Sequence, residues 1–181
     1  MKSKFFFIVV VVIAVSGLIV LYNSKTVEKN IIVTNFEECA KAGNPVMESY
    51  PRQCRHDKIT YTEFIGNILD KSDLIKLFSP RPNEIIKSPL VIRGEARGTW
   101  FFEASFPIFV TNWDGLIIGQ GIAEAKSDWM TEDFVPFEAT ITFTNPTYGE
   151  RGALILKKDN PSGLPEHDDA LEIPIKFEIT Q

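Results

Sequence analysis

Residues 135–143 read VPFEATITF, and this alternation decides the fold class. Apolar side chains occupy every second position, while the positions between them are mostly polar. The apolar set is Val135, Phe137, Ala139, Ile141 and Phe143, and the other set is Pro136, Glu138, Thr140 and Thr142. A period of two is typical of a β-strand with one buried face.

The same alternation recurs on both sides of this stretch, in residues 100–112 and 171–179. Weaker strand signals lie at 84–86, 90–94, 116–126 and 152–157. Turn residues separate these segments, and Asp114-Gly115 is a typical hairpin turn. Seven short strands without a helical stretch predict an all-β sandwich. Pro174 lies inside the last strand, which predicts that this strand is at an edge or beside a bulge.

The region of residues 77–180 also contains an ordered set of short sequence pieces. They are Ser79-Pro80, Ser88-Pro89, Leu90–Ala96, Phe102-Glu103-Ala104, Asp114-Gly115, Trp129 with Phe134, and Ile173-Pro174-Ile175. In this order they resemble the immunoglobulin-like domain of bacterial spore germination, the Gmad type. The resemblance implies an immunoglobulin-like sandwich in an extracytoplasmic, envelope-associated setting, and it implies no catalytic residues.

The N-terminus contains an almost unbroken apolar run, Phe5 to Tyr22, preceded by Lys2 and Lys4. A helix of this length spans about 27 Å, close to the hydrocarbon thickness of a bilayer. We expect an uncleaved signal anchor over residues 1–22 and a stalk over 23–34. The alternative is a cleaved signal peptide, because Ala14-Val15-Ser16 imitates a cleavage site. Basic residues flank the run on both sides, so the positive-inside rule gives only a weak preference.

The two cysteines, Cys39 and Cys54, lie in one short segment, residues 35–64. We predict a disulfide between them, since closing a loop of about 15 residues contributes about 3 kcal/mol in the chain-entropy model. Metal binding would need further soft ligands, and a redox pair is normally Cys-x-x-Cys. A disulfide requires an oxidising compartment, which favours an extracytoplasmic body. The segment is similar to a short two-cysteine module of bacterial envelope proteins, and residues 65–76 are expected to link it to a sandwich over 77–181.

Few residues suggest a binding or catalytic site. The cluster Glu166-His167-Asp168-Asp169 offers oxygen ligands, and Asp168 and Asp169 are weak candidates for calcium. It lacks the alternating spacing of a calcium loop, so a solvated loop is the preferred interpretation and no metal or other cofactor is expected. Phe101 and Phe109 fall on the polar side of their strand, which makes them candidates for a surface contact.

These features favour a binding protein over an enzyme. The formal net charge is −5, which argues against nucleic acid as a partner. Neither histidine, His56 or His167, lies in a recognisable catalytic motif. We therefore expect a non-catalytic binding or assembly module, anchored in the cell membrane by one span, with another envelope protein or a glycan as its partner. The alternative is an envelope enzyme or a protease inhibitor that acts through the two-cysteine segment, with Met47 to Arg52 presented to a protease.

Overall fold

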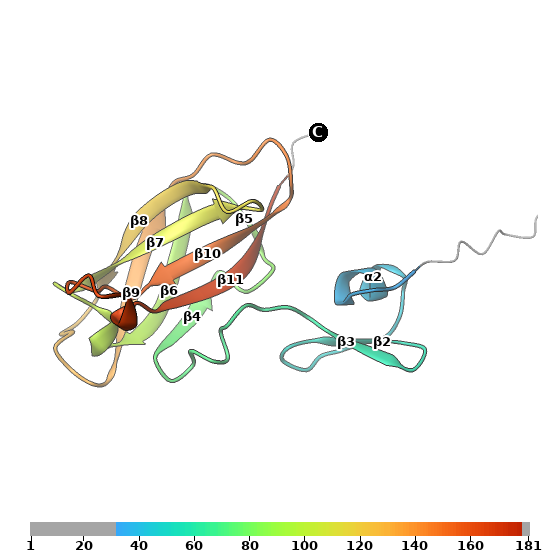
Figure 1. Cartoon of the computed structure of the whole chain (residues 1–181), viewed down its shortest axis with the longest axis horizontal. Helices are drawn as coiled ribbons and strands as arrows, with labels where there is room; N and C mark the ends of the chain where they lie inside the picture. The colour runs from blue at the N-terminus through green and yellow to red at the C-terminus, as the bar shows by residue number, and fades with distance from the viewer. Residues whose placement is uncertain (1–31, 179–181) are drawn as a thin grey trace, which may run out of the picture.

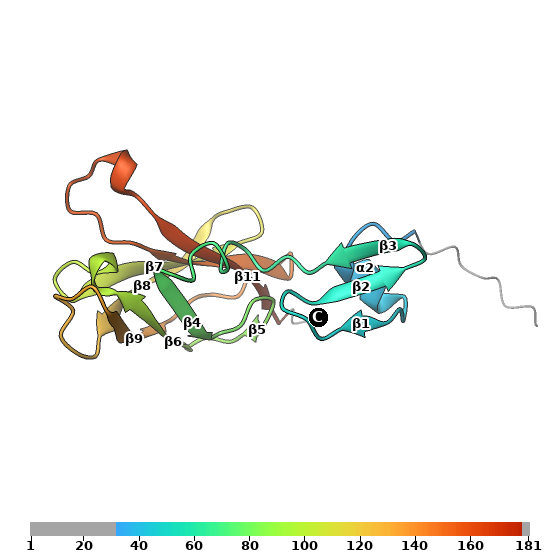
Figure 2. The same cartoon turned by 90° about the horizontal axis from the view of Figure 1, so that it is seen from below.

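The computed structural model describes residues 32–178. Two folded units follow one another along the long axis of this part of the chain, a small one with both cysteines and a larger β-structure (Figures 1 and 2). The predicted membrane helix, Phe5 to Tyr22, and most of the predicted stalk lie outside the described residues. Within residues 32–178, no helix has the length and apolarity needed to cross a membrane.

The larger unit, called the sandwich below, contains eight strands in one hydrogen-bonded sheet. They are β4 (Ile75–Ser79), β5 (Ile85–Ile86), β6 (Leu90–Arg97), β7 (Ser105–Asn112), β8 (Ile117–Ala125), β9 (Phe134–Ile141), β10 (Arg151–Lys157) and β11 (Ala170–Phe177). Their order in the sheet is β4-β6-β9-β8-β7-β10-β11-β5. Short 3-10 turns occur at Gly98–Trp100 and Pro165–His167.

The sheet divides into two layers between β8 and β9. These strands share only two register pairs, Glu124↔Glu138 and Ala125↔Phe137, apart from an isolated bridge at Gly119. Strands β4, β6 and β9 form one layer, and β8, β7, β10, β11 and β5 form the other (Figure 2). The apolar faces of both layers meet in the core, where the rings of Phe106 on β7 and Phe137 on β9 pack edge to face at 4.9 Å. The predicted all-β sandwich is thus confirmed, with eight strands where seven were predicted.

Two features of the strands, the start of β4 and the position of Pro174, can be compared with the sequence predictions. Strand β4 was not predicted, and it begins at Ile75, inside the segment expected to be a linker. The prediction that the last strand lies at an edge or beside a bulge is wrong, since β5 pairs with β11 at Lys176 and Phe177 and ends the sheet. Pro174 is tolerated because it precedes this pairing, on the outer side of β11, where its carbonyl accepts a hydrogen bond from the Asn83 backbone N–H at 2.7 Å. The N–H that proline lacks would have faced the same side, so the ladder with β10 loses nothing.

The alternation predicted for residues 100–112 is wrong in its first part. Strand β7 begins only at Ser105, because residues 102–105 form a tight turn in which Phe102 and Ser105 exchange backbone hydrogen bonds. Glu103 and Ala104 adopt positive φ angles of 48° and 62° in this turn. The turn breaks the alternation of faces, so that Phe101 is only 4% exposed and packs on Phe106, whereas Phe102 is 40% exposed. The prediction that Phe101 is a surface contact is therefore wrong.

The smaller unit, called the cysteine module below, comprises residues 35–64. It contains α2 (Phe36–Lys41) and a three-stranded sheet of β1 (Val46–Met47), β2 (Gln53–His56) and β3 (Ile59–Thr62). The Asn35 side chain caps α2 by accepting a hydrogen bond from the Glu38 N–H at 2.9 Å. The predicted Cys39–Cys54 disulfide is present and joins α2 to β2. Together with Phe36 it forms a small buried core, which compensates for the short length of the module.

The adjacent phenylalanines allow a matched test of the corrected strand start. We predict that Phe101→Ala lowers the free energy of unfolding by about 3–5 kcal/mol, because it removes a buried ring from the core. Phe102→Ala should cost less than about 1 kcal/mol, because the Phe102 ring is half exposed. Urea denaturation followed by tryptophan fluorescence measures both values. Equal losses for the two variants would contradict the burial of Phe101.

Candidate functional site

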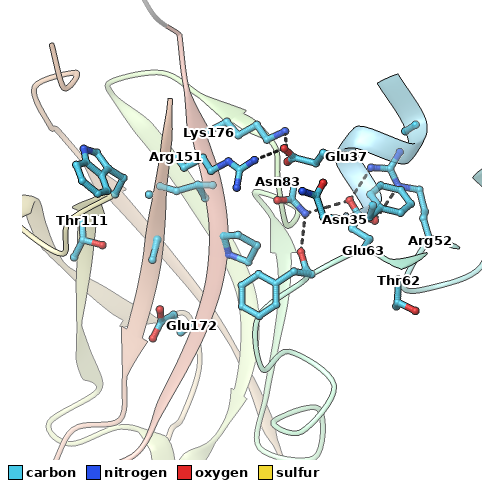
Figure 3. Close-up of a pocket in the computed structure, with 18 of the residues that line it drawn as sticks. Asn35, Glu37, Arg52, Thr62, Glu63, Asn83, Thr111, Arg151, Glu172 and Lys176 are labelled. Carbon is cyan, nitrogen blue, oxygen red and sulfur yellow. Dashed lines mark hydrogen bonds and ion pairs between the residues drawn. The ribbon is translucent and has the colours of Figure 1, made fainter. Parts of the chain in front are cut away.

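A cavity of about 790 Å³ lies where the cysteine module meets the sandwich (Figure 3). Its walls come from α2 and the end of β3 on one side, and from β10, β11 and the β7–β8 turn on the other. We call it the interdomain groove. Its size lies within the range of ligand sites in proteins, about 300–1,000 Å³.

One carboxylate of the module spans the groove. Glu37 of α2 bonds Lys176 of β11 at 2.9 Å and also pairs with Arg151 of β10 (Figure 3). Partial burial acts to raise the pKa of Glu37, but the hydrogen bond and charge of Lys176, with the charges of Arg151 and Lys41, outweigh it and lower that pKa. Glu37 is thus held ionised between two cations, and it fixes the module against the sandwich.

A second carboxylate of the module, Glu63, forms another contact between the module and the sandwich. The guanidinium of Arg52 donates to both oxygens of Glu63, at 2.8 and 2.7 Å. Asn83 of the sandwich donates to the same carboxylate at 3.1 Å and to the Phe64 carbonyl at 2.8 Å. The hydrogen bond from Arg52 is the main reason why the pKa of Glu63 is lowered. Glu63 therefore ties an internal ion pair of the module to the start of the sandwich.

The segment predicted as a linker is attached to the edge of β11. The Asn67 side chain donates to the Ala170 carbonyl at 2.9 Å and accepts from the Glu172 N–H at 2.8 Å. The neighbouring Gly66 has a φ of 73°, and a Cβ atom there would lie 1.9 Å from the Glu172 carbonyl oxygen. Only glycine fits this approach, so the connection between the two units follows the sandwich closely instead of extending freely.

An exposed indole borders the groove on the sandwich side. Trp113, in the predicted β7–β8 turn, is 59% exposed, yet several contacts hold it in place. Its ring packs edge to face on Tyr148 at 6.2 Å, and the Tyr148 hydroxyl donates to Asp114 at 3.2 Å. A Cβ atom on Gly149 would lie 2.3 Å from the indole, so the backbone there also packs closely on Trp113. The indole is therefore a preorganised and accessible aromatic surface.

Phe109 lies on the outer face of the sandwich, beside the groove. It is half-buried, with Gln120 of β8 and Ile155 of β10 as its cross-strand neighbours. The adjacent row of this face, Thr111, Ala153 and Pro174, lines the groove itself. Its partial exposure is compatible with the predicted surface contact, which stays a prediction.

The opposite outer face of the sandwich has a different character. It is covered by ion pairs between neighbouring strands, including Arg93–Glu138 at 2.7 Å and Lys76–Glu95 at 2.8 Å. Side chains paired in this way form a solvated surface. The contrast between the two faces places the candidate binding surface on the β7-β10-β11 side.

The predicted acidic candidates do not form a common site. Asp168 bonds Asn160 at 3.0 Å and lies 3.4 Å from Lys157, whereas Asp169 pairs with Lys71 at 2.6 Å. Each carboxylate is thus already matched to a different lysine. Among residues 32–178, no three His, Cys, Asp or Glu side chains gather in a metal-binding group.

Sequence reasoning missed most of the groove. Glu37, Arg151 and Lys176 gave no motif, because each is an ordinary surface charge in its own segment. Trp113 directly precedes Asp114-Gly115, and the turn predicted there is confirmed, since the Gly115 N–H donates to the Asn112 carbonyl at 3.1 Å. The turn is also what presents the indole to the groove, and an exposed large aromatic residue at a hairpin tip could have been the signal.

The Glu37 contact predicts a pH-dependent attachment of the module. Because its folded pKa lies below the ordinary value of 4.5, the contact stabilises the closed arrangement above that pH. The stabilisation should be lost as the pH falls through the lowered pKa. Spin labels at Lys58→Cys and Leu164→Cys would report the distance between module and sandwich. We expect one narrow distance distribution at pH 7 that broadens in acid, at a pH below the ordinary carboxyl pKa of 4.5.

Glu37→Gln should broaden the same distribution already at pH 7. The matched control is Glu38→Gln on the same helix, because the hydrogen bonds of Glu38 to Thr34 lower its pKa without crossing to the sandwich. It should leave the distribution narrow. If the Glu37 and Glu38 variants behave alike, Glu37 does not hold the two units together.

Comparison with known proteins agrees with the architecture of the sandwich. A family model described as the immunoglobulin-like domain of bacterial spore germination, Gmad2, matches residues 74–163. The match runs from β4 to the end of β10 and includes neither the cysteine module nor β11. No curated protein and no solved structure matches the chain. Residues 74–163 of this chain therefore belong to the Gmad2 family of immunoglobulin-like domains.

Proposed function

We propose that this protein is a non-catalytic binding or assembly module of the bacterial cell envelope, anchored in the membrane by residues 5–22 with its body outside the cell. The observation that carries the binding role is the interdomain groove, where a preorganised indole, Trp113, borders a cavity of ligand size. The Cys39–Cys54 disulfide and the apolar N-terminal run support the extracytoplasmic placement.

The groove favours binding over catalysis because most of its charged groups are paired with one another. Glu37 is paired with two cations, and Glu63 is bound by Arg52 and Asn83. Neither histidine lines the groove: His56 contacts Asn44 inside the module, and His167 lies in the exposed Pro165–His167 turn. A general base would need to be within reach of a bound substrate, and the groove offers no histidine for that role.

The inhibitor alternative has less support. A protease-binding segment at Met47 to Arg52 would have to present its side chains to the enzyme. The side chains of Met47 and Tyr50 are exposed, but the Arg52 guanidinium is held by both oxygens of Glu63. Releasing it would break a charge-assisted pair and leave Glu63, which is almost fully buried, without its main partner.

The binding role predicts retention by envelope material. Detergent-solubilised full-length protein should sediment with washed cell-envelope fragments, and Trp113→Ala should reduce the retained fraction at least about tenfold, since it removes the exposed ring at the groove. Phe109→Ser should reduce it less. The control is Leu164→Ala, which removes an exposed apolar side chain outside the groove. Retention that is unaffected by Trp113→Ala would contradict binding through this groove.

The topology can be tested separately. Protease added to intact spheroplasts should remove the body of the protein, because the proposed span at residues 5–22 leaves residues 32–178 outside. An antibody against the sandwich, used on blots before and after treatment, measures the loss, and a cytoplasmic protein serves as the control for lysis. Protection in intact cells, with cleavage only after lysis, would place the body inside.

A further inference from the structure

The groove also contains information on the chemistry of its ligand. This inference rests on the proposed binding function and concerns the same site. Three features of the groove indicate which chemical class of ligand it can bind. They are the pairing of its charges, the hydrogen bonds already made along the outer side of β11, and the aromatic surface at its border.

Most charges of the groove are paired within the protein, and the lining as a whole has a surplus of only one positive charge. Its lining contains the carboxylates Glu37, Glu63 and Glu172 and the cations Lys41, Arg52, Arg151 and Lys176. Two of these carboxylates and three of these cations already form ion pairs with one another. A strongly charged ligand would have to displace these pairs and leave a partly buried charge unmatched. An uncharged ligand has no such cost.

The strand edge beside the groove is closed to peptide addition. Along the outer side of β11, the carbonyls of Glu172 and Pro174 accept from the backbone N–H groups of Asn67 and Asn83, at 3.1 and 2.7 Å. The Lys176 N–H donates to the Glu84 carbonyl at 2.9 Å. Adding an extended peptide to a sheet requires free backbone groups on an exposed edge. The backbone groups along this edge are already hydrogen-bonded to other parts of the chain, so a peptide strand is disfavoured at this position.

The remaining lining combines an aromatic surface with neutral polar side chains. Thr62 provides an exposed hydroxyl, and Asn83, whose amide nitrogen already donates to Glu63 and Phe64, keeps its amide oxygen as an acceptor. Thr111 and Asn112 also line the groove but are each only 6% exposed. The face of an indole carries negative charge density and attracts the weakly positive C–H groups of an apolar ring face. Sugar rings have such a face together with hydroxyl groups around their rim, which amides and hydroxyls can bind. We propose that the interdomain groove binds an uncharged segment of a glycan, with one sugar ring on the exposed indole of Trp113.

Isothermal titration of the detergent-solubilised full-length protein tests this ligand class. The probes are the hexamer of N-acetylglucosamine and cellohexaose, which are both uncharged oligosaccharides, and an uncharged twelve-residue Ser/Gly/Thr peptide is the comparison. We expect at least one oligosaccharide to bind and the peptide not to bind. Trp113→Ala should weaken that binding at least about tenfold. Trp113→Phe should retain most of it because an aromatic face remains, and Leu164→Ala should not change it. Absence of binding by both oligosaccharides, or binding that Trp113→Ala leaves intact, would overturn the proposal.

Envelope fragments treated with a glycan-digesting enzyme or with a protease distinguish failure of the glycan proposal from failure of the binding function on which it rests. If Trp113-dependent retention is lost when the glycan is digested and survives protease treatment of the fragments, the glycan proposal stands. If it survives glycan digestion and is lost after protease treatment, the groove binds a protein, and the glycan proposal is wrong while the binding function holds. If no retention depends on Trp113, both are wrong.

Discussion

The separation of β8 from β9 is the constraint on which the rest of this structure depends. The two strands pair fully at one end only, so a single eight-stranded sheet opens into two layers that must be held by packing. Edge-to-face contacts provide part of that packing, between Phe106 and Phe137 near the centre and between Phe143 and Phe177 further along. No disulfide lies within the sandwich, so its apolar core and the short β8–β9 pairing hold the layers together.

The outer faces of the two packed layers carry different kinds of side chain. The β6-β9 face carries cross-strand ion pairs and presents a solvated surface. The β7-β10-β11 face carries Phe109, Ile155, Ala153 and Pro174, and the cysteine module packs beside its end. The groove exists because a second folded unit is held there by two carboxylates, Glu37 and Glu63, each bonded to groups on the sandwich. Its walls thus combine a rigid sheet with a small, disulfide-closed unit.

This arrangement gives a physical reason for attaching a short cysteine module to an immunoglobulin-like domain. The module has a core of only three buried residues and gains its fixed position from contacts with the sandwich. Gly66 and Asn67 keep the connection close to β11, which limits the directions in which the module can move. The groove is consequently bordered on one side by the sandwich sheet and on the other by a small unit that polar contacts hold in place.

A feature of this structure could be predicted from the sequence when the residues that form it lie close together along the chain. Several features follow from patterns within one segment or from two nearby cysteines: the faces of β9 and β11, the Asp114-Gly115 turn and the disulfide. The edge position predicted for β11 is wrong because β5, a distant segment, pairs with it. The prediction failed at Phe101 because a turn at Glu103 and Ala104 interrupts the alternation, and positive φ angles at these two residues are not signalled by their side chains.

The sequence by itself therefore determined the class of the fold, the inward face of most strands and the cross-link of the module, because alternation and cysteine spacing are local properties of the chain. Only the tertiary structure decided which charges and rings border the groove. Glu37 meets Arg151 across 114 positions of sequence, and Glu172 meets Asn67 across 105. These contacts form only when the two layers and the module pack together. The sequence around a charged residue in an exposed segment does not indicate which distant residue will become its partner.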